Sequence, residues 1–239
     1  MKRVIILGAT SGIGEGLARL YAAQGQTRVG VMGRRSERLD ALCREHPDVV
    51  VAQPCDVAQK EMVASCLDKL AGRLGGVDVL ILSAGTGELN PRLDVETECR
   101  TLAVNVEGWT RVTDWAVNYF ERQGQGHLAA ISSVGGLRGS GAAPAYNASK
   151  AFQMNYLEGL RQRLHKTGLP ITVTDIRPGF VDTAMAQGEG LFWIVPVDKA
   201  CRRIHRAIER RQKVVYVSRR WRYVALLLRL MPGELWCRM

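Results

Sequence analysis

The chain has 239 residues, of which 46% are hydrophobic and only 6% aromatic, and its formal net charge is +10. No apolar run approaches the ~18 residues of a membrane-spanning helix, and the run at residues 4–7 is too short for a secretion signal. Six scattered cysteines form no CxxC pair or Cys/His cluster, so we expect neither disulfides nor a metal site, but reduced thiols in a cytoplasmic protein.

Short apolar runs rich in β-branched residues alternate with amphipathic stretches along the chain. The runs predict strands at residues 2–7, 28–32, 49–52, 77–82, 127–132, 171–176 and 213–217. The stretches between them predict helices at residues 13–24, 36–46, 59–74, 95–121, 144–167, 197–211 and 220–231. Because such alternation builds βαβ units, we expect an α/β fold of the Rossmann type, with a seven-stranded parallel sheet between two layers of helices. No linker or repeat interrupts it, so residues 1–239 are expected to form one domain, with a helix and tail at 219–239.

A glycine-rich turn joins the first strand to the first helix. Its glycines follow the spacing G-x-x-x-G-x-G at Gly8, Gly12 and Gly14. Small residues let the backbone approach a pyrophosphate, and a helix N-terminus offers free N–H groups to phosphate. The alternative is a plain tight turn, but the strand–turn–helix context favours a dinucleotide site. Its expected contacts are Gly8, Thr10, Ser11, Gly12, Ile13 and Gly14.

A second group of polar residues surrounds the start of the 144–167 helix. Tyr146 and Lys150 lie four residues apart and therefore share one helix face. There the ammonium can lower the pKa of the phenol, ordinarily ~10, so that the phenol exchanges a proton with a carbonyl or alcohol oxygen. Ser133 supplies a hydroxyl that can hold the same oxygen. The alternative is an exposed tyrosine, a solvated lysine and an ordinary loop serine.

These motifs together resemble the short-chain dehydrogenase/reductase family, in its compact single-domain branch, over residues 1 to about 217. The resemblance implies that Tyr146 is the general acid in reduction and the base in oxidation. Lys150 is implied to lower its pKa and to hold the ribose of the nicotinamide. Ser133 is implied to orient the substrate oxygen, and Asn105 to position a water in the proton path.

The resemblance also implies cofactor contacts from later turns. Asp56 is expected to accept a hydrogen bond from the adenine amino group, although it is also a candidate N-cap for the 59–74 helix. Thr183 is expected near the nicotinamide carboxamide, in a segment that closes over it. The other implied contacts are Val57, Ser83, Ala84, Gly85, Pro178, Gly179 and Val181, with Ser83 standing where the family usually has Asn.

The residues after the second strand predict which nicotinamide cofactor is used. An acidic residue there would hold the adenosine ribose hydroxyls and repel a 2′-phosphate. This chain instead has Gly33 followed by Arg34 and Arg35, and a guanidinium forks onto phosphate oxygens. We therefore expect NADP(H), with Arg34 as the favoured phosphate contact and Arg35 beside it. The alternative is that both arginines are solvated loop charges.

Two segments bear on the substrate and partners. Residues 184–196 carry large apolar side chains that favour a hydrophobic ketone or aldehyde, or else cover the core: Met185, Leu191, Phe192, Trp193 and Ile194. Residues 199–222 hold ten Lys/Arg against one glutamate, whereas residues 1–198 are electrically balanced. The apolar and basic stretch 219–231 favours packing on the sheet edge or on another subunit, with a peripheral membrane contact as the alternative. The basic patch at 199–222 could also bind an acidic carrier such as an acyl thioester of coenzyme A. No motif accompanies the charge that would indicate nucleic acid.

The sequence thus predicts an NADP(H)-dependent oxidoreductase that interconverts a ketone or aldehyde and an alcohol, on a hydrophobic, lipid-like substrate. The alternative is a non-catalytic NADP(H)-binding sensor or scaffold on the same fold. The family resemblance implies a homodimer or homotetramer.

Overall fold

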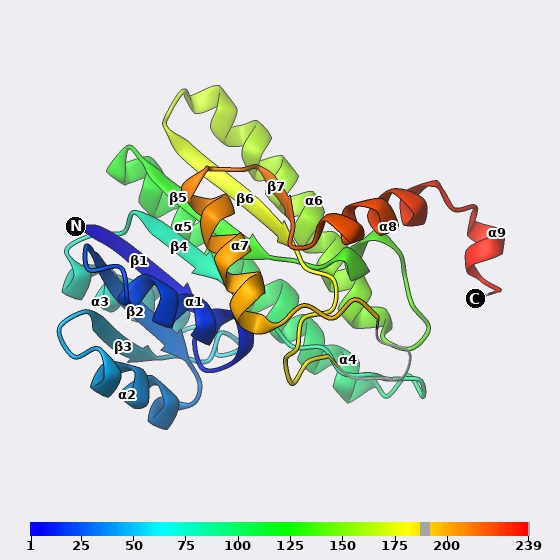
Figure 1. The fold of residues 1–239 in the computed structure, drawn as a ribbon, viewed down its shortest axis with the longest axis horizontal. Helices are drawn as coiled ribbons and strands as arrows, with labels where there is room; N and C mark the ends of the chain where they lie inside the picture. Colours follow the sequence, from blue (N-terminus) through cyan, green and yellow to red (C-terminus); the bar gives the residue numbers. More distant parts are fainter. Residues whose placement is uncertain (187–191, 239) are drawn as a thin grey trace.

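The computed structural model describes residues 1–186 and 192–238. Seven parallel strands form one sheet in the order β3-β2-β1-β4-β5-β6-β7. The predicted Rossmann-type α/β fold is confirmed, with helices on both faces (Figure 1). The strands are β1 (Lys2–Leu7), β2 (Thr27–Gly33), β3 (Val50–Pro54), β4 (Val79–Leu82), β5 (Gly126–Ile131), β6 (Ile171–Arg177) and β7 (Val214–Tyr216).

Two hydrophobic cores lie on opposite faces of the sheet because successive residues of a strand point to opposite sides. In β1, Val4 and Ile6 join one core, whereas Ile5 and Leu7 join the other. The first core is covered by α1 (Gly12–Ala22), α2 (Ser36–Glu45) and α7 (Val197–Glu209). The second is covered by α3 (Val63–Leu74), α5 (Trp109–Gln123) and α6 (Pro144–Thr167).

Several helix boundaries differ from the prediction. α3 begins at Val63 rather than near 59, and Met62 is its N-cap. The Asp56 carboxylate instead accepts a hydrogen bond from the Ala58 N–H, which makes a local turn, so its predicted role as the cap of this helix is wrong. The predicted 95–121 helix comprises α4 (Val95–Leu102), a π-helical turn (Ala103–Gly108) and α5. A 3₁₀ turn (Val134–Leu137) and α9 (Gly233–Trp236) were not predicted.

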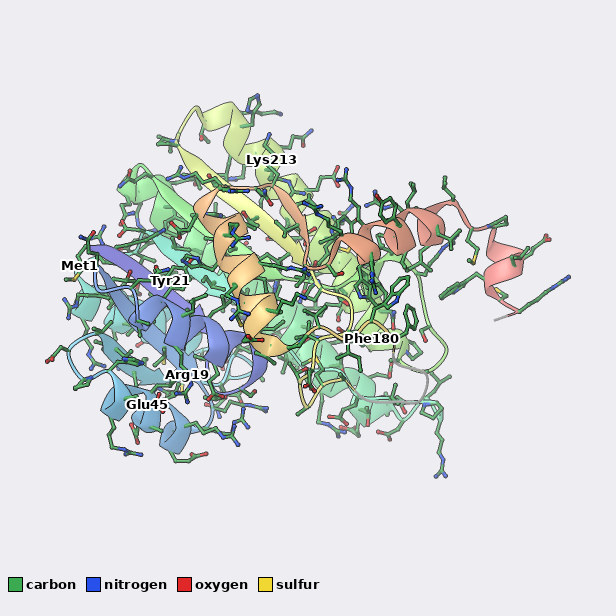
Figure 2. All side chains as sticks on the ribbon, viewed as in Figure 1. Met1, Arg19, Tyr21, Glu45, Phe180 and Lys213 are labelled. Carbon is green, nitrogen blue, oxygen red and sulfur yellow. The ribbon has the colours of Figure 1, made fainter. Side chains whose placement is uncertain are left out.

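All strands point the same way, so the loops after β1, β4, β5 and β6 meet at one edge of the sheet. Because β1 and β4 are neighbours while β2 and β3 extend to the other side, the strand order reverses at this point, which is where open α/β sheets bind ligands. Figure 2 shows Phe180 just beyond β6 at this edge, and Met1 at the opposite edge.

The C-terminal helix α8 (Arg219–Leu230) extends from the body at the ligand edge, and α9 follows it (Figure 1). α8 buries Trp221 and Ala225 against the body. Within the described residues, no helix is long and apolar enough to cross a membrane.

Candidate active site

The glycine-rich turn after β1 is packed too closely to hold side chains. Gly8 and Gly12 have φ angles of 83° and 55°, which glycine adopts at little cost. A Cβ on Gly14 would lie 2.2 Å from the carbonyl oxygen of Gly8. A Cβ on Gly8 would lie 2.5 Å from the backbone nitrogen of Ala84. The turn therefore holds the first residues of α1 against the end of β4, as a phosphate-binding turn requires.

Arginine side chains line the outer side of this turn. The guanidinium of Arg35 donates to the carbonyl oxygen of Thr10 at 3.0 Å and to its hydroxyl at 2.8 Å. It also donates to the hydroxyl of Ser11 at 2.9 Å. Arg38, in α2, donates to the same Thr10 carbonyl at 3.1 Å. The sequence favoured Arg34, but Arg34 is exposed and has no hydrogen-bond partner in the part of the chain that the structure describes, whereas Arg35 reaches the turn. Arg38 was missed, although its spacing of three from Arg35 was a usable signal.

Lys150 is a buried charged group at the ligand edge. Its ammonium donates to the carbonyl oxygen of Ile131 at 3.2 Å and to the side-chain oxygen of Gln153 at 3.1 Å. Burial lowers its pKa to about 8, and the negative charge of Asp175 acts in the opposite direction. Lys150 lies 5.7 Å from the ring centre of Tyr146, so the structure brings this pair together as predicted.

Tyr146 lies between Ser133 and Gly87. A Cβ on Gly87 would lie 2.5 Å from the Tyr146 ring, so glycine there leaves room for the phenol. Burial raises the pKa of Tyr146, while a hydrogen bond with the Ser133 side chain acts in the opposite direction. The predicted lowering of the Tyr146 pKa is therefore wrong for this structure, in which burial raises that pKa. The hydroxyl of Ser133 also accepts from the Gly135 N–H at 3.0 Å, which fixes its rotamer.

Asn105 is fully buried in the π-helical turn between α4 and α5. Its side-chain amide donates to the Thr86 carbonyl at 2.6 Å and to the Ser149 hydroxyl at 3.0 Å, and its side-chain oxygen accepts from the Thr86 N–H at 2.9 Å. Its backbone carbonyl accepts from Gln153 at 2.8 Å. Single π turns are common at functional sites. Through these hydrogen bonds of Asn105, this one connects the loop after β4 to α6. A Cβ on Gly85 would lie 3.3 Å from the Asn105 side-chain oxygen and 3.5 Å from the Lys150 nitrogen.

The segment after β6 returns toward the glycine-rich turn. The Val134 N–H donates to the Pro178 carbonyl at 2.9 Å, and Val181 forms an isolated β-bridge with Val195. The methyl group of Thr183 lies against Gly12, at 3.0 Å from where a Cβ would stand. Thr183 thus lies against the glycine-rich turn, in the segment that was predicted to close over the nicotinamide.

Four aromatic residues cluster beside this segment. Trp221 of α8 stacks on Phe192, with ring centres 5.2 Å apart, and meets Phe180 edge-on at 5.2 Å. Trp193 joins them at the edge of Phe192. Trp221 also lies so close to Gly179 that any Cβ there would overlap its indole. Sequence reasoning missed Trp221 as part of the site, because Phe180 and Phe192, which its ring contacts, lie far from it in the chain. Leu191, also predicted here, lies outside the described residues.

A buried ion pair supports the end of β6. Arg177 and Asp175 approach to 2.6 Å, and both side chains are almost fully buried. Asp175 also accepts from the hydroxyl of Ser132, the neighbour of Ser133. Arg177 donates to the Tyr216 hydroxyl at 3.2 Å. This pair was not predicted from the sequence, and through Ser132 and Tyr216 it links the end of β5 to β6 and β7.

The remaining predicted contacts follow the strand ends. Val57 packs its carbonyl against Gly108 of the π-helical turn, and the Ile13 carbonyl accepts from the Cys201 thiol at 3.5 Å. Ser83 extends the sheet, because its N–H donates to the Leu7 carbonyl at 2.9 Å. The structure thus gathers the predicted site residues around one edge of the sheet.

The comparisons with known proteins agree with this arrangement. The short chain dehydrogenase family profile matches residues 2–191. An uncharacterised oxidoreductase of Mycobacterium tuberculosis is 35% identical over 193 residues, which cover 77% of this chain and 75% of that one. The crystal structure of serine dehydrogenase from Escherichia coli is 30% identical, with a TM-score of 0.69, covering 74% of this chain and 82% of that one. A short-chain dehydrogenase from Sphingobium yanoikuyae in complex with NADPH has a TM-score of 0.81 at 24% identity, covering 98% and 97% of the two chains, and shows the shared fold.

Proposed function

The chain belongs to the short-chain dehydrogenase family, and from that premise we propose that it is an NADP(H)-dependent oxidoreductase that reduces a hydrophobic ketone or aldehyde to an alcohol. The observation that carries the proposal is the group formed by Tyr146, Ser133 and Lys150 at the ligand edge of the sheet. That group adjoins a glycine-rich turn whose close packing fits a pyrophosphate.

In this proposal the dinucleotide, when bound, supplies the hydride that reaches the carbonyl carbon. Tyr146 gives its phenolic proton to the substrate oxygen, which becomes the hydroxyl of the alcohol. Because burial raises the Tyr146 pKa, the phenol stays protonated at neutral pH and is ready to donate. Ser133 holds the substrate oxygen beside it. Lys150, with a pKa of about 8, remains largely cationic at pH 7 and stabilises the phenolate that forms.

The preference for NADP(H) rests on the arginines beside the phosphate turn. Arg35 has its guanidinium on Thr10 and Ser11, and Arg38 lies on Thr10. β2 ends in Gly33 with no carboxylate to hold ribose hydroxyls, so two cations face the place where a 2′-phosphate would come. We propose Arg35 as the principal phosphate contact, with Arg34 and Arg38 contributing charge.

Steady-state kinetics with both cofactors tests this assignment. Arg35→Gln is expected to lower kcat/KM for NADPH by roughly 10- to 100-fold, since a charge-assisted hydrogen bond contributes about 1.5–3 kcal/mol. Its kcat/KM for NADH should change little. Arg34→Gln is the matched control, which removes the same charge from an exposed side chain and should have a several-fold smaller effect. A wild-type preference for NADH would contradict the assignment.

The proposed substrate class rests on the aromatic cluster of Phe180, Phe192 and Trp221, which packs against Gly179 in the segment after β6. The similarity to a serine dehydrogenase supports instead a small polar hydroxy acid. A screen that follows NADPH absorbance across ketones of increasing chain length, and NADP⁺ reduction with serine and its analogues, separates the two. Activity that rises with chain length supports the hydrophobic class, and activity with serine alone contradicts it.

The non-catalytic sensor is the competing function. Tyr146→Phe keeps the ring packed on Gly87 and removes only the proton donor, so turnover should fall by roughly a hundredfold or more while NADPH binding persists. If the wild type and Tyr146→Phe bind NADPH with the same affinity and neither turns over any substrate in the screen, the sensor is favoured. The family resemblance also leads us to propose a cytoplasmic homodimer or homotetramer, which light scattering checks.

A further inference from the structure

We propose that the outward face of α8 docks on the surface of an anionic phospholipid bilayer. Helices on protein surfaces normally turn polar residues to solvent. α8 instead exposes four large side chains there: Tyr223 is 74% exposed, Leu226 57%, Leu227 60% and Leu230 72%. Contiguous exposed apolar surface of this kind marks a binding surface.

Arginines flank the apolar face on both sides. With about 3.6 residues per turn, Arg222 and Arg229 lie along one edge of the exposed stripe and Arg220 along the other. None of these three makes an ion pair within the described residues. Long arginine side chains can reach headgroups while the leucines between them enter the acyl boundary, and a tyrosine rests at headgroup depth.

Charge decides between a bilayer and a second copy of the chain. Residues 219–239 hold five arginines and one glutamate, a net charge of +4, and α8 itself contains no acidic residue. A symmetric dimer through α8 would bring two such faces together and repel. An anionic surface is complementary, and each basic residue near it contributes roughly 1 kcal/mol.

The surface continues beyond α8 onto the segment before α7. The guanidinium of Arg220 lies 5.5 Å from the ring centre of Trp193. Trp193 and its neighbours Phe192 and Ile194 are each nearly half exposed. Between this segment, α7 and the first turn of α8 lies a cleft of about 280 Å³, whose lining includes Lys199, Arg203 and Arg220 and no carboxylate. The apolar face thus adjoins a cationic cleft. This combination matches the apolar chains and the negatively charged headgroup of an anionic phospholipid.

The body holds α8 in a fixed orientation. Trp221 packs against Gly179, and Arg138 donates to the Leu228 carbonyl at 2.7 Å and to the Met231 carbonyl. Trp236 donates to the Gly139 carbonyl at 2.8 Å. These contacts reach the loops that follow Ser133 and Pro178, so a docked α8 would hold those loops near the bilayer. That α8 docks is independent of the reaction, and only the consequence that the carbonyl substrate is a bilayer lipid rests on the proposed function.

Vesicle flotation of the full chain tests the proposal. We expect the protein to float with phosphatidylcholine vesicles that contain phosphatidylglycerol, and to float less with phosphatidylcholine alone or at high salt. Leu227→Asn/Leu230→Asn, which changes no charge, should weaken binding roughly tenfold or more. Arg222→Gln/Arg229→Gln should weaken it to a similar extent on anionic vesicles only. Met62→Asn is the matched control, because Met62 is 55% exposed on the turn before α3 and should leave binding unchanged.

Thermal melting and NADPH titration of each variant establish that the body remains folded. Equal flotation of wild type and Leu227→Asn/Leu230→Asn would overturn the proposal, since the vesicles would then be bound without the leucines of the apolar face. Absence of flotation, together with an oligomer in light scattering that the leucine substitutions dissociate, would overturn it in favour of a second copy.

Discussion

Replacing Asp175 by asparagine removes the counter-charge of Arg177 and changes almost nothing else in shape. The two groups approach to 2.6 Å, and only 6% of the Arg177 side chain is exposed. Removing one partner of a buried pair costs about 3–5 kcal/mol, because the other charge stays buried without compensation. With a urea slope of about 3 kcal/mol/M, the unfolding midpoint should fall by about 1–1.7 M at unchanged slope.

The surface pair of Arg3 and Asp78 is the control for this experiment. It has nearly the same separation, 2.7 Å, but both side chains are about a quarter exposed. Asp78→Asn should therefore cost only about 1 kcal/mol, or roughly 0.3 M in the urea midpoint. A midpoint shift for Asp175→Asn no larger than that for Asp78→Asn would refute the reasoning from burial.

The same substitution has an electrostatic consequence at the site. The Asp175 carboxylate raises the Lys150 pKa against the effect of burial, so asparagine should move that pKa below about 8. Under the proposed function, the alkaline limb of the pH–rate profile then shifts to lower pH. An unchanged alkaline limb in a variant that folds would show that Asp175 does not act on Lys150.

Two further predictions concern the glycine-rich turn and a buried histidine. Gly14→Ala places a Cβ 2.2 Å from a backbone oxygen, so NADPH affinity by fluorescence titration should fall at least about tenfold, whereas Gly72→Ala, where nothing lies within 4 Å, should leave it unchanged. Burial lowers the pKa of His127 to about 4, so the unfolded chain binds the extra proton first as pH falls below about 6.5. The free energy of unfolding should therefore fall by about 3 kcal/mol between about pH 6.5 and 4 because of this group. In His127→Gln, the urea midpoint should fall less steeply over the same pH range.

The sequence predicts those parts of the site whose residues are only a few positions apart in the chain. The glycines of the phosphate turn and the pair of Tyr146 and Lys150 lie within one turn or one helix, so local geometry settles how they face. Arg35 and Arg38 show the limit of this reasoning. Arg35 follows the second strand and Arg38 lies in the predicted 36–46 helix, but that these two guanidinium groups, rather than that of Arg34, reach Thr10 depends on how α2 packs.

Contacts between residues far apart in the chain could not be predicted from the sequence pattern. Trp221 meets Gly179 only because the chain after β7 folds back over the loop after β6, and no period or motif encodes that return. The π-helical turn at Asn105 was also invisible, since an apolar pattern with a period near 3.6 does not register one wider turn. The Tyr146 pKa was predicted in the wrong direction because burial, unlike spacing, is a property of the packed molecule.

The two ends of the chain differ in what can be attached to them. Met1 is 79% exposed and lies at the opposite end of the sheet from the site, where an affinity tag or a fluorescent fusion would be harmless. At the other end, Trp236 and Arg138 tie the last helices to loops that support Ser133 and Gly179. We therefore expect a C-terminal tag to affect these contacts more than an N-terminal tag, and activity assays of two preparations that differ only in tag position check this.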